Sequence, residues 1–454
     1  MRTLAEIRLL LLEHRTSAVE LVGEALARAR DPAGEGARAY TQLYPESAAA
    51  AAAQADVRRD KGERAGPLSG IPISIKSLFD VAGETTLAGS VACRGEPSAA
   101  ADAPVVARLK AAGAVIVGKT NMSEFAFSGL GLNPHYGTPL NPWDRAARRI
   151  PGGSSSGAAV SVADGMAAAA IGTDTGGSVR IPAALCGLVG FKPTAARVPR
   201  VGTFALSPTL DSVGPLGPSV ACCALLDGVL SGEGSALPSP PPAQRIRLAA
   251  PQRCVLEGMD AAVGKAFERA KSRLAAAGVQ VCEVELAELE ELAEINASGG
   301  FAACESYAIH RERLERVGAE YDPRVRSRIL RGREMTASDV RVLENARAGF
   351  IARITAALVG FDAMIMPTVP VLAPALGPLE ASDEAYYRTN LLLLRNPSIA
   401  NFLDGCSISI PCHEPGEAPV GLMLIGARQA DRRLLAIGLT VEALVSPRFA
   451  ALQP

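Results

Sequence analysis

Two glycine-rich turns carry serines in a pattern typical of a nucleophile and its proton relay. The first reads PGGSSSG over residues 151–157, and the second reads GTDTGGSVR over residues 172–180. Glycine lacks a Cβ, so the backbone N–H groups of such turns can approach a ligand closely. A serine hydroxyl needs a neighbouring base before it becomes a nucleophile, and a desolvated lysine can serve as that base. The turns therefore predict a serine hydrolase if such a lysine is present.

Lys76 is the candidate base. It ends the apolar run GIPISIK at residues 70–76 and is followed by Leu78 and Phe79, a pattern typical of the end of a buried strand. Burial disfavours the charged ammonium form and lowers the pKa of a lysine. A lysine that is neutral near pH 7 is a competent base. Taken alone, this segment leaves open a structural lysine whose amine reaches solvent or an ion pair.

The second turn supplies a nucleophile and donors for negative charge. The amides of Thr175, Gly176, Gly177 and Ser178 are consecutive and can face one point. Such an oxyanion hole stabilises a tetrahedral intermediate by about 3 kcal/mol per donor. Ser178 is the expected attacking group. The alternatives are an ordinary glycine turn or a phosphate-binding loop, although the patterns GxxxxGK[ST] and GxGxxG are absent.

A histidine-based mechanism has weaker support. No GxSxG elbow is present, which argues against an α/β-hydrolase triad. A triad histidine can be distant in sequence from its serine, so chain order excludes none of the four histidines. None of them has a context as suggestive as that of Lys76: His14, His135, His310 and His413. A Ser-His-Asp mechanism therefore stays open as a minor alternative.

Helical and strand patterns alternate along the chain and predict an α/β fold with helices covering a sheet. Helical patterns cover residues 3–30 (two helices, with Thr16-Ser17 as an N-cap), 47–59, 104–113, 156–169, 260–277 and much of 286–358. Strand patterns cover residues 71–75, 114–117, 245–251, 279–286, 362–370 and 421–426. The proline-rich stretch 237–243 is the clearest linker candidate. Because strands on both sides can complete one sheet, we expect a single domain over residues 1–454.

The composition is that of a globular protein with a large core. Of the 454 residues 48% are hydrophobic and 20% charged, and a net charge of -1 indicates no footprint for nucleic acid or an anionic membrane. The nine cysteines lack CxxC spacing, so free thiols are expected rather than disulfides or a zinc site. Glu6, Arg8 and Glu13 interrupt the N-terminal leucine run at helical spacing, which predicts an amphipathic helix. No apolar stretch is long enough to span a bilayer, and a cytoplasmic protein is expected.

The chain resembles the amidase signature family. The segments that carry the resemblance follow the family's order over nearly the whole chain. They read GIPISIK, GKTNMSEFAFS, NPWD, PGGSSSG, GTDTGGSVRIPAALCGLVGFKPT, DSVGPLGP, MPTVPVLAP and APVGLMLIG. The resemblance implies a central mixed β-sheet covered by helices on both faces, with the core signature region at about residues 65–220.

The resemblance also implies a Ser–cisSer–Lys triad. It makes Ser178 the nucleophile, Ser154 the bridging serine and Lys76 the base, with a cis peptide bond between Gly153 and Ser154. Neutral Lys76 would take a proton from Ser154, which would take one from Ser178. No metal or organic cofactor is needed for this chemistry.

Neighbouring residues are expected to support the triad. Asp174 and Arg180 bracket the second turn and can brace it by hydrogen bonds, and Ser155 can hydrogen-bond within the triad. By family resemblance the segment Phe125, Ala126, Phe127 and Ser128 approaches the acyl site, although core packing explains its phenylalanines equally well. The sequence departs from the family at Ser77, where an acidic residue is common; a missing carboxylate would help to keep Lys76 neutral.

The expected function is hydrolysis of a small-molecule carboxamide, anilide or carbamate, with release of ammonia or an amine. One alternative is the A subunit of the tRNA-dependent amidotransferase, although its familiar SIRQPA reads SVRIPA at residues 178–183 here. An alternative of another class is a binding protein that keeps the fold without catalysis. The sequence leaves the substrate and the oligomeric state open, with a homodimer as one candidate assembly.

Overall fold

A mixed β-sheet of 11 strands forms the centre of the computed structural model, which describes residues 1–446. The strands follow the spatial order β1-β3-β2-β4-β6-β5-β10-β11-β9-β7-β8. Their bounds are β1 (Tyr40–Leu43), β2 (Pro72–Lys76), β3 (Val115–Thr120), β4 (Ala169–Asp174), β5 (Val189–Lys192), β6 (Ser212–Gly217), β7 (Arg247–Pro251), β8 (Gln280–Val284), β9 (Ala363–Pro367), β10 (Ser407–Pro411) and β11 (Gly421–Ile425). The pairs β2–β3, β2–β4, β7–β8 and β7–β9 are parallel, and the others are antiparallel.

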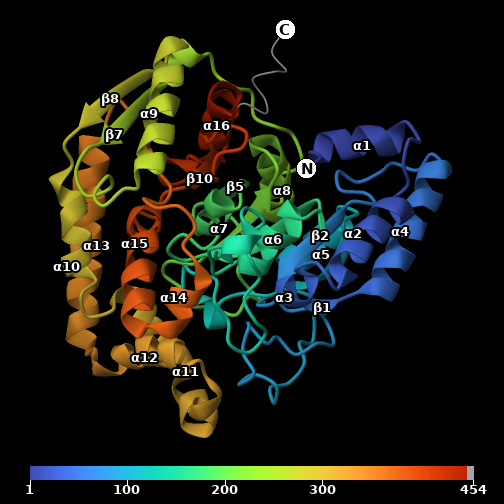
Figure 1. The fold of residues 1–454 in the computed structure, drawn as a ribbon, viewed down its shortest axis with the longest axis horizontal. Helices are drawn as coiled ribbons and strands as arrows, with labels where there is room; N and C mark the ends of the chain where they lie inside the picture. Colours follow the sequence, from blue (N-terminus) through green and yellow to red (C-terminus); the bar gives the residue numbers. More distant parts are fainter. Residues whose placement is uncertain (447–454) are drawn as a thin grey trace.

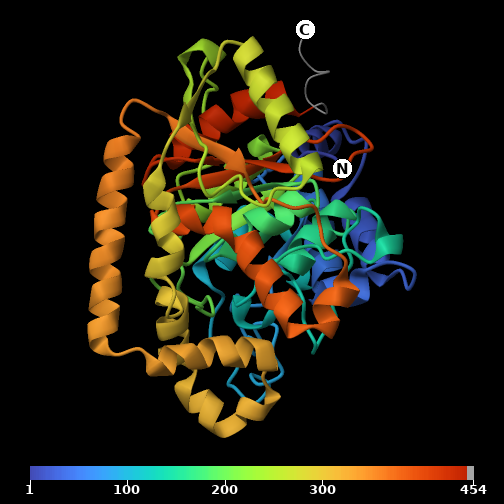
Figure 2. The same ribbon diagram turned by 60° about the vertical axis from the view of Figure 1, so that its left-hand side comes forward.

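Helices cover both faces of this sheet, as Figures 1 and 2 show. Their bounds are α1 (Leu4–Leu12), α2 (Ala18–Arg30), α3 (Gly36–Ala39), α4 (Pro45–Asp60), α5 (Pro104–Ala111), α6 (Ser156–Ala163), α7 (Arg180–Leu185), α8 (Val220–Ser231), α9 (Ala261–Ala276), α10 (Glu291–Ile295), α11 (Gly300–Val317), α12 (Pro323–Leu330), α13 (Ala337–Ala357), α14 (Leu376–Ala381), α15 (Asp383–Phe402) and α16 (Asp431–Val445). In Figure 1 the helices α1, α2 and α4 lie at one end of the molecule, and β7, β8 and α13 lie at the other.

The alternation of side chains along β9 shows why both faces are covered. Ile365 packs in one apolar cluster with residues of α9 and α16, whereas Met364 and Met366 pack in another with residues of α13 and α15. Successive side chains of a strand point to opposite faces, so a strand without polar alternation must be buried on both sides. The fold class expected from the sequence, a mixed sheet between helices, is confirmed.

The proline-rich stretch 237–243 does not separate two sheets. Strand β5, which precedes it, pairs with β10, which follows it, through Ser407↔Lys192 and Ile408↔Phe191. Strands on the two sides of the proline-rich stretch thus share one hydrogen-bonded ladder. This pairing brings the segment after α15 against the signature turns.

Local signals predicted some helix ends well and one end poorly. Ser17 caps α2, and its hydroxyl accepts a hydrogen bond from the amide of Glu20 in a capping box, as the N-cap prediction required. The helix expected over residues 156–169 instead ends at Ala163. Gly165 adopts a positive φ of 70°, and residues from Ala169 onward form β4. The alanine-rich composition hid this turn because alanine also fits a closely packed, fully buried strand.

No helix within residues 1–446 is long and apolar enough to cross a membrane.

All nine cysteines are free thiols; Cys254, Cys282 and Cys304 are half-buried and the others are buried.

Candidate active site

Lys76 lies at the carboxyl end of β2, between two parallel neighbours. Strand β3 flanks β2 on one side and β4 on the other. Parallel strands end at the same edge of a sheet, so the end of β4 brings Thr173 beside Lys76. Lys76 is fully buried, and its Nζ donates hydrogen bonds to Ser154 Oγ at 2.7 Å and to Thr173 Oγ1 at 3.0 Å.

The surroundings of Lys76 favour the neutral amine. Burial lowers its pKa to about 7, while the negative charges of Asp174 and Asp211 oppose part of that shift. Its two hydrogen-bond partners are neutral hydroxyls, which stabilise an ammonium less than a carboxylate does. A substantial fraction of Lys76 is therefore neutral near pH 7.

Ser154 is held by a tightly packed turn before α6. The peptide bond between Gly153 and Ser154 is cis, as the family resemblance implies. The Gly153 amide donates to the Gly129 carbonyl at 2.8 Å, and the Ser123 amide donates to the Ser154 carbonyl at 3.1 Å. A Cβ at Gly153 would lie 2.5 Å from the Gly131 nitrogen, so only glycine fits there.

Ser178 lies on the neighbouring segment, between the second turn and α7. The amide of Ser155 donates to the Ser178 carbonyl at 3.2 Å, which places the two serine segments side by side. Ser178 is 3% exposed, and its Oγ makes no hydrogen bond with any other described residue. The segment that carries Ser178 is thus bonded to the segment that carries Ser154, and the Ser178 hydroxyl has no partner among residues 1–446.

The second turn presents backbone donors of two kinds. The Gly177 amide donates to Asp174 Oδ1 at 2.8 Å. Within residues 1–446 the amides of Thr175, Gly176 and Ser178 have no acceptor. Gly177 has a φ of 129°, and a Cβ there would lie 2.6 Å from Pro397 Cβ, so this position needs glycine. Three of the four amides expected to form the oxyanion hole are unoccupied, and the fourth is engaged by Asp174.

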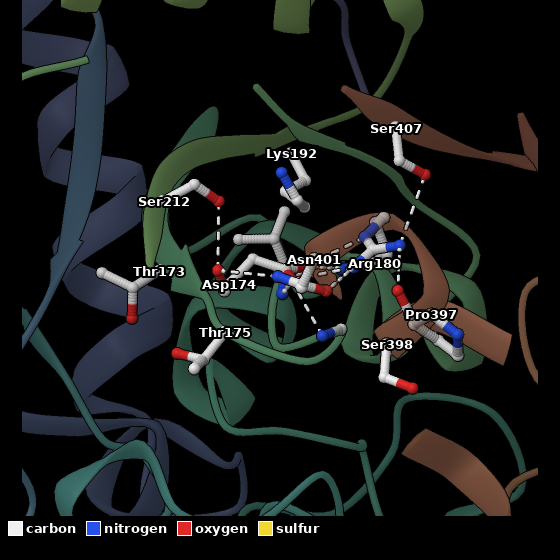
Figure 3. A network of polar contacts seen from close by, with 12 residues as sticks. Thr173, Asp174, Thr175, Arg180, Lys192, Ser212, Pro397, Ser398, Asn401 and Ser407 are labelled. Carbon is white, nitrogen blue, oxygen red and sulfur yellow. Dashed lines mark hydrogen bonds and ion pairs between the residues drawn. The ribbon is translucent and has the colours of Figure 1, made fainter. Parts of the chain in front are cut away.

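Asp174 and Arg180 form a buried network beneath this turn (Figure 3). Both side chains are fully buried, and Arg180 Nη2 lies 2.9 Å from Asp174 Oδ1. Asp174 Oδ2 also accepts from the Val179 amide at 3.0 Å, and Asn401 Nδ2 donates to Asp174 Oδ1 at 2.9 Å. Burial by itself opposes ionisation of Asp174, but the Arg180 guanidinium holds the pKa of that carboxyl well below its usual range. An ionised Asp174 can thus fix the turn around the Ser178 segment.

Sequence reasoning missed two polar neighbours of the site. Thr173 contacts Lys76, as described above, and Asp211 Oδ1 accepts a hydrogen bond from Thr175 Oγ1 at 2.5 Å. The Asp211 carboxyl also accepts from the Leu206 and Ser207 amides, and burial raises its pKa to about 6. Thr173 lies in the segment GTDTGGS, and Asp211 lies in the segment DSVGPLGP. No sequence spacing predicts that these two segments are in contact.

The segment from Phe125 to Ser128 has mixed surroundings. Phe125 and Ala126 have positive φ values of 50° and 61°. The Phe125 ring packs 5.2 Å from Phe204 and 4.4 Å from His310, which is core packing. Ser128 Oγ donates to Asn390 Oδ1 at 3.1 Å.

Ser155 Oγ, which was expected to bond within the triad, donates to the Thr173 carbonyl at 3.4 Å.

The four histidines have partners other than the serines of the two turns. His135 contacts Glu124 at 2.8 Å and His310 contacts Tyr321 at 2.9 Å, while His14 lies 3.9 Å from Asp60 and His413 accepts from the Val420 amide. Among residues 1–446, no group of three or more His, Cys, Asp or Glu side chains is arranged to hold a metal ion.

Comparison with known proteins agrees with this architecture. A family model described as Amidase matches residues 20–435. A 2-amino-5-chloromuconic acid deaminase of Comamonas testosteroni is 38% identical over 91% of this chain and 90% of its own. The AtzE chain of 1-carboxybiuret hydrolase from Pseudomonas sp. (strain ADP) is 36% identical over 91% of this chain and 92% of its own. The A subunit of the glutamyl-tRNA(Gln) amidotransferase of Chloroflexus aggregans is 34% identical over 93% of this chain and 92% of its own.

A solved structure of an amidase superimposes over nearly the whole molecule. Its TM-score is 0.88 at 34% sequence identity, covering 98% of this chain and 100% of that chain. The matched family model and the solved structure together span both serine turns and the strand that ends at Lys76. The chain therefore belongs to the amidase signature family and is a hydrolase that acts on C–N bonds.

Proposed function

We propose that this protein hydrolyses a carboxamide or a related acyl–nitrogen bond through an acyl-enzyme on Ser178. Ser154 relays protons, and Lys76 is the base. The observation that supports this proposal most strongly is the fully buried Lys76 amine, with a pKa of about 7 and a bond of 2.7 Å to Ser154 Oγ. Within residues 1–446 no carboxylate forms an ion pair with this amine, whereas Ser154 offers it a hydroxyl to deprotonate.

The first half of the reaction forms the acyl-enzyme. Neutral Lys76 accepts the proton of Ser154, and Ser154 accepts the proton of Ser178 as Ser178 Oγ attacks the carbonyl carbon. The carbonyl oxygen becomes an oxyanion, which the free amides of Thr175, Gly176 and Ser178 stabilise. When the tetrahedral intermediate collapses, the C–N bond breaks, Ser154 passes a proton to the departing nitrogen, and Lys76 returns to Ser154 the proton that it took. The nitrogen therefore leaves as ammonia or a neutral amine.

The second half releases the acid. A water molecule attacks the ester carbon and gives a proton to Ser154, which passes its own proton to Lys76, so the relay runs in the same direction as in acylation. The same amides bind the second oxyanion. On collapse Ser154 returns a proton to Ser178 Oγ, Lys76 returns its proton to Ser154, and the carboxylic acid is liberated. Every step uses groups that lie at the ends of β2 and β4 and in the two serine turns.

Residues around the triad position these groups. Asp174 orders the second turn because it accepts the Gly177 and Val179 amides while Arg180 neutralises its charge. In this proposal the Gly177 amide braces the turn, and the other three amides bind the oxyanion. Ser155 holds its segment against the Thr173 carbonyl. The segment from Phe125 to Ser128 borders the acyl site, because the residues that flank it bond to Ser154 and Gly153.

The substrate is proposed to carry a carboxylate as well as the bond that is cleaved. Two relatives have names that specify such compounds, 2-amino-5-chloromuconic acid and 1-carboxybiuret. Both relatives cover nine-tenths of this chain, so their similarity includes the site and its surroundings.

Activity-based labelling and nitrogen release test the proposed function together. A fluorophosphonate probe should label Ser178 of the wild-type protein, and Ser178→Ala should remove the labelled site. A panel of primary amides, anilides and carbamates should release ammonia or an amine with the wild type only. A folded wild-type protein that neither labels nor releases nitrogen would favour a binding protein with the same fold.

The A subunit of the tRNA-dependent amidotransferase is the second candidate, because such a protein from Chloroflexus aggregans is 34% identical to this chain. That function predicts co-purification with a tRNA-binding partner protein, and release of ammonia from glutamine only in its presence. Turnover of amides by the isolated chain favours the stand-alone hydrolase.

A further inference from the structure

The backbone carbonyl of Asp174, at the end of β4, accepts hydrogen bonds from two buried side chains. Ser212 Oγ of β6 donates to this oxygen at 3.0 Å, and Asn401 Nδ2 of α15 donates to it at 3.2 Å. Ser212 is 1% exposed and Asn401 is 3% exposed. Figure 3 shows both side chains beside Asp174. They lie 38 and 227 positions further along the chain, so the two bonds depend on the tertiary fold.

The Asp174 carbonyl belongs to the same peptide group as the Thr175 amide. This peptide group is trans. A trans peptide is planar, and its C=O and N–H point in opposite directions. The bonds from Ser212 and Asn401 to the oxygen therefore direct the Thr175 N–H to the other side. That amide has no acceptor within residues 1–446, and the proposed mechanism assigns it to the oxyanion.

The Ser178 amide is oriented in the same way, but by backbone alone. The Ile181 amide, in the first turn of α7, donates to the Gly177 carbonyl at 2.7 Å. Because that carbonyl is held by the helix, the Ser178 N–H of the same peptide group points away from it. One oxyanion donor is thus oriented by a helix, and another is oriented by two side chains.

The glycines of the second turn explain why its peptide groups need external bonds. Gly176 follows Thr175 directly, and Gly177 has a φ of 129°. Glycine allows more backbone conformations than any other residue, and it loses more conformational freedom when it is fixed. A peptide group in such a turn can rotate about its flanking φ and ψ angles while it stays planar. A rotated Asp174–Thr175 peptide would present an acceptor where the oxyanion needs a donor.

We propose that Ser212 and Asn401 are positioning residues that keep the Thr175 amide directed towards the oxyanion. They act through the Asp174 carbonyl and do not touch the substrate. This inference rests on the hydrolase function proposed above and identifies the groups that make one oxyanion donor available. The oxyanion forms after the substrate has bound, so loss of these residues should lower kcat and leave KM nearly unchanged.

The two residues differ in their other contacts. Asn401 Nδ2 also donates to Asp174 Oδ1 at 2.9 Å, and Asn401 Oδ1 accepts from Arg180 Nη2 at 2.7 Å. Among the described residues, Ser212 Oγ bonds only to the Asp174 carbonyl. Variants of Ser212 therefore isolate the effect on the peptide group, whereas a variant of Asn401 needs an equally buried control.

Ser212→Ala removes one of the two bonds. It should lower kcat by about 10-fold for the amide that the wild type hydrolyses fastest, with KM changed by less than about twofold. Ser212→Thr keeps the hydroxyl and should retain near-normal kcat. Ser409→Ala is the matched control, because Ser409 is a fully buried serine of β10 whose hydroxyl contacts Thr368 Oγ1 at 2.7 Å. It should leave kcat and KM unchanged.

Asn401→Leu removes the second bond at a similar side-chain volume. It should lower kcat by about 10-fold, and Ser212→Ala/Asn401→Leu should lower it by about 100-fold, as expected for the loss of one oxyanion donor. Asn396→Leu is the control: Asn396 is buried on the same helix, and its Nδ2 donates to the carbonyls of Val255 and Pro367. It should cost similar stability in urea unfolding and leave kcat near the wild-type value.

Three results would overturn the positioning role. The first is an equal loss of kcat in Asn401→Leu and Asn396→Leu, which would indicate a general effect of lost stability. The second is a rise in KM that accounts for the lower kcat/KM. The third is a folded Ser212→Thr protein that is as slow as Ser212→Ala, because the hydroxyl would then not matter.

Fluorophosphonate labelling separates this inference from the proposed function. The phosphonyl oxygen of the probe enters the oxyanion site as Ser178 attacks, so Ser212→Ala/Asn401→Leu should label about 100-fold more slowly than the wild type. A double variant that labels and turns over like the wild type leaves the hydrolase function intact and removes the positioning role. A folded wild type that neither labels nor turns over removes the hydrolase function, and this inference with it.

Discussion

Thr173 Oγ1 lies 3.0 Å from Lys76 Nζ, so two hydroxyls hold the buried amine, and Thr173 is the one that the sequence did not reveal. The two contacts keep the Lys76 amine beside Ser154 Oγ. Thr173→Val removes the hydroxyl at nearly constant volume and should lower kcat by about 10-fold, which corresponds to one hydrogen bond to a charged or titrating group. Thr173→Ser keeps the hydroxyl and should retain near-normal activity. Equal losses in the two variants would indicate packing rather than hydrogen bonding.

Removing the amine of Lys76 should abolish most of the activity. Lys76→Met fills the same buried space without a base, and amide turnover should fall by about 10³-fold, as expected for loss of a general base. Steady-state release of ammonia measures the effect. Lys61→Met, at an exposed lysine, provides the control and should be unaffected. Near-normal rates in Lys76→Met would remove lysine from the mechanism.

The pH dependence of kcat/KM should follow the ionisation of Lys76. Its pKa of about 7 lies below the ordinary 10.5, so the neutral, active form increases as pH rises through 7. Activity should therefore rise towards alkaline pH with a single ionisation near 7. The Asp211 charge raises the pKa of Lys76, so Asp211→Asn should move the midpoint to lower pH. A shift to higher pH would contradict the assignment.

The free energy of unfolding should also depend on pH through the ionisation of Lys76. Between about pH 7 and 10.5 the unfolded chain binds a proton at Lys76 that the folded chain does not. The free energy of unfolding contributed by this residue therefore rises with pH across that window and is lowest below pH 7. Urea unfolding of the wild type and of Lys76→Met at several pH values measures this effect. The wild type should gain free energy of unfolding relative to Lys76→Met as pH rises from 7 to 10.5.

Ser154 should matter more for amides than for esters. An amide nitrogen must receive a proton before it leaves, whereas an ester oxygen leaves more easily. Ser154→Ala should lower amide turnover by about 10²–10³-fold and turnover of the matching ester by a smaller factor. Competition between an amide and its methyl ester in one assay measures the ratio. If both substrates lose the same factor, Ser154 acts only on the first proton transfer.

The buried pair of Asp174 and Arg180 should contribute to both stability and turn geometry. Both side chains are 0% exposed, so Arg180→Met leaves an uncompensated buried carboxylate and should cost about 3–5 kcal/mol in the free energy of unfolding. The double variant Asp174→Asn/Arg180→Met removes that charge and should regain part of the loss. Chemical unfolding of the single and double variants measures the coupling. Additive losses would mean that the two residues act independently.

Some features of the site could be predicted from the sequence because they are local. Lys76 ends an apolar run, and any residue there is buried at the end of a strand. The serines of both turns are flanked by glycines whose positions require a missing Cβ, as the close approaches at Gly153 and Gly177 show. Ser17 forms a capping box with a residue three positions later. The family resemblance then ordered the motifs and implied the cis bond at Ser154.

Other features were decided only by tertiary structure. Strands β5, β6 and β10 are buried on both faces, so they lack the alternation that marks a strand in a sequence, and their neighbours lie far along the chain. The availability of each amide in the oxyanion turn depends on where the Asp174 carboxylate lies. Thr173 and Asp211 acquire their roles from contacts between segments distant in sequence. The sequence by itself determined which groups can do the chemistry, and the packing of the sheet decided which of them meet, because hydrogen bonds and burial are set by distance in space rather than by separation along the chain.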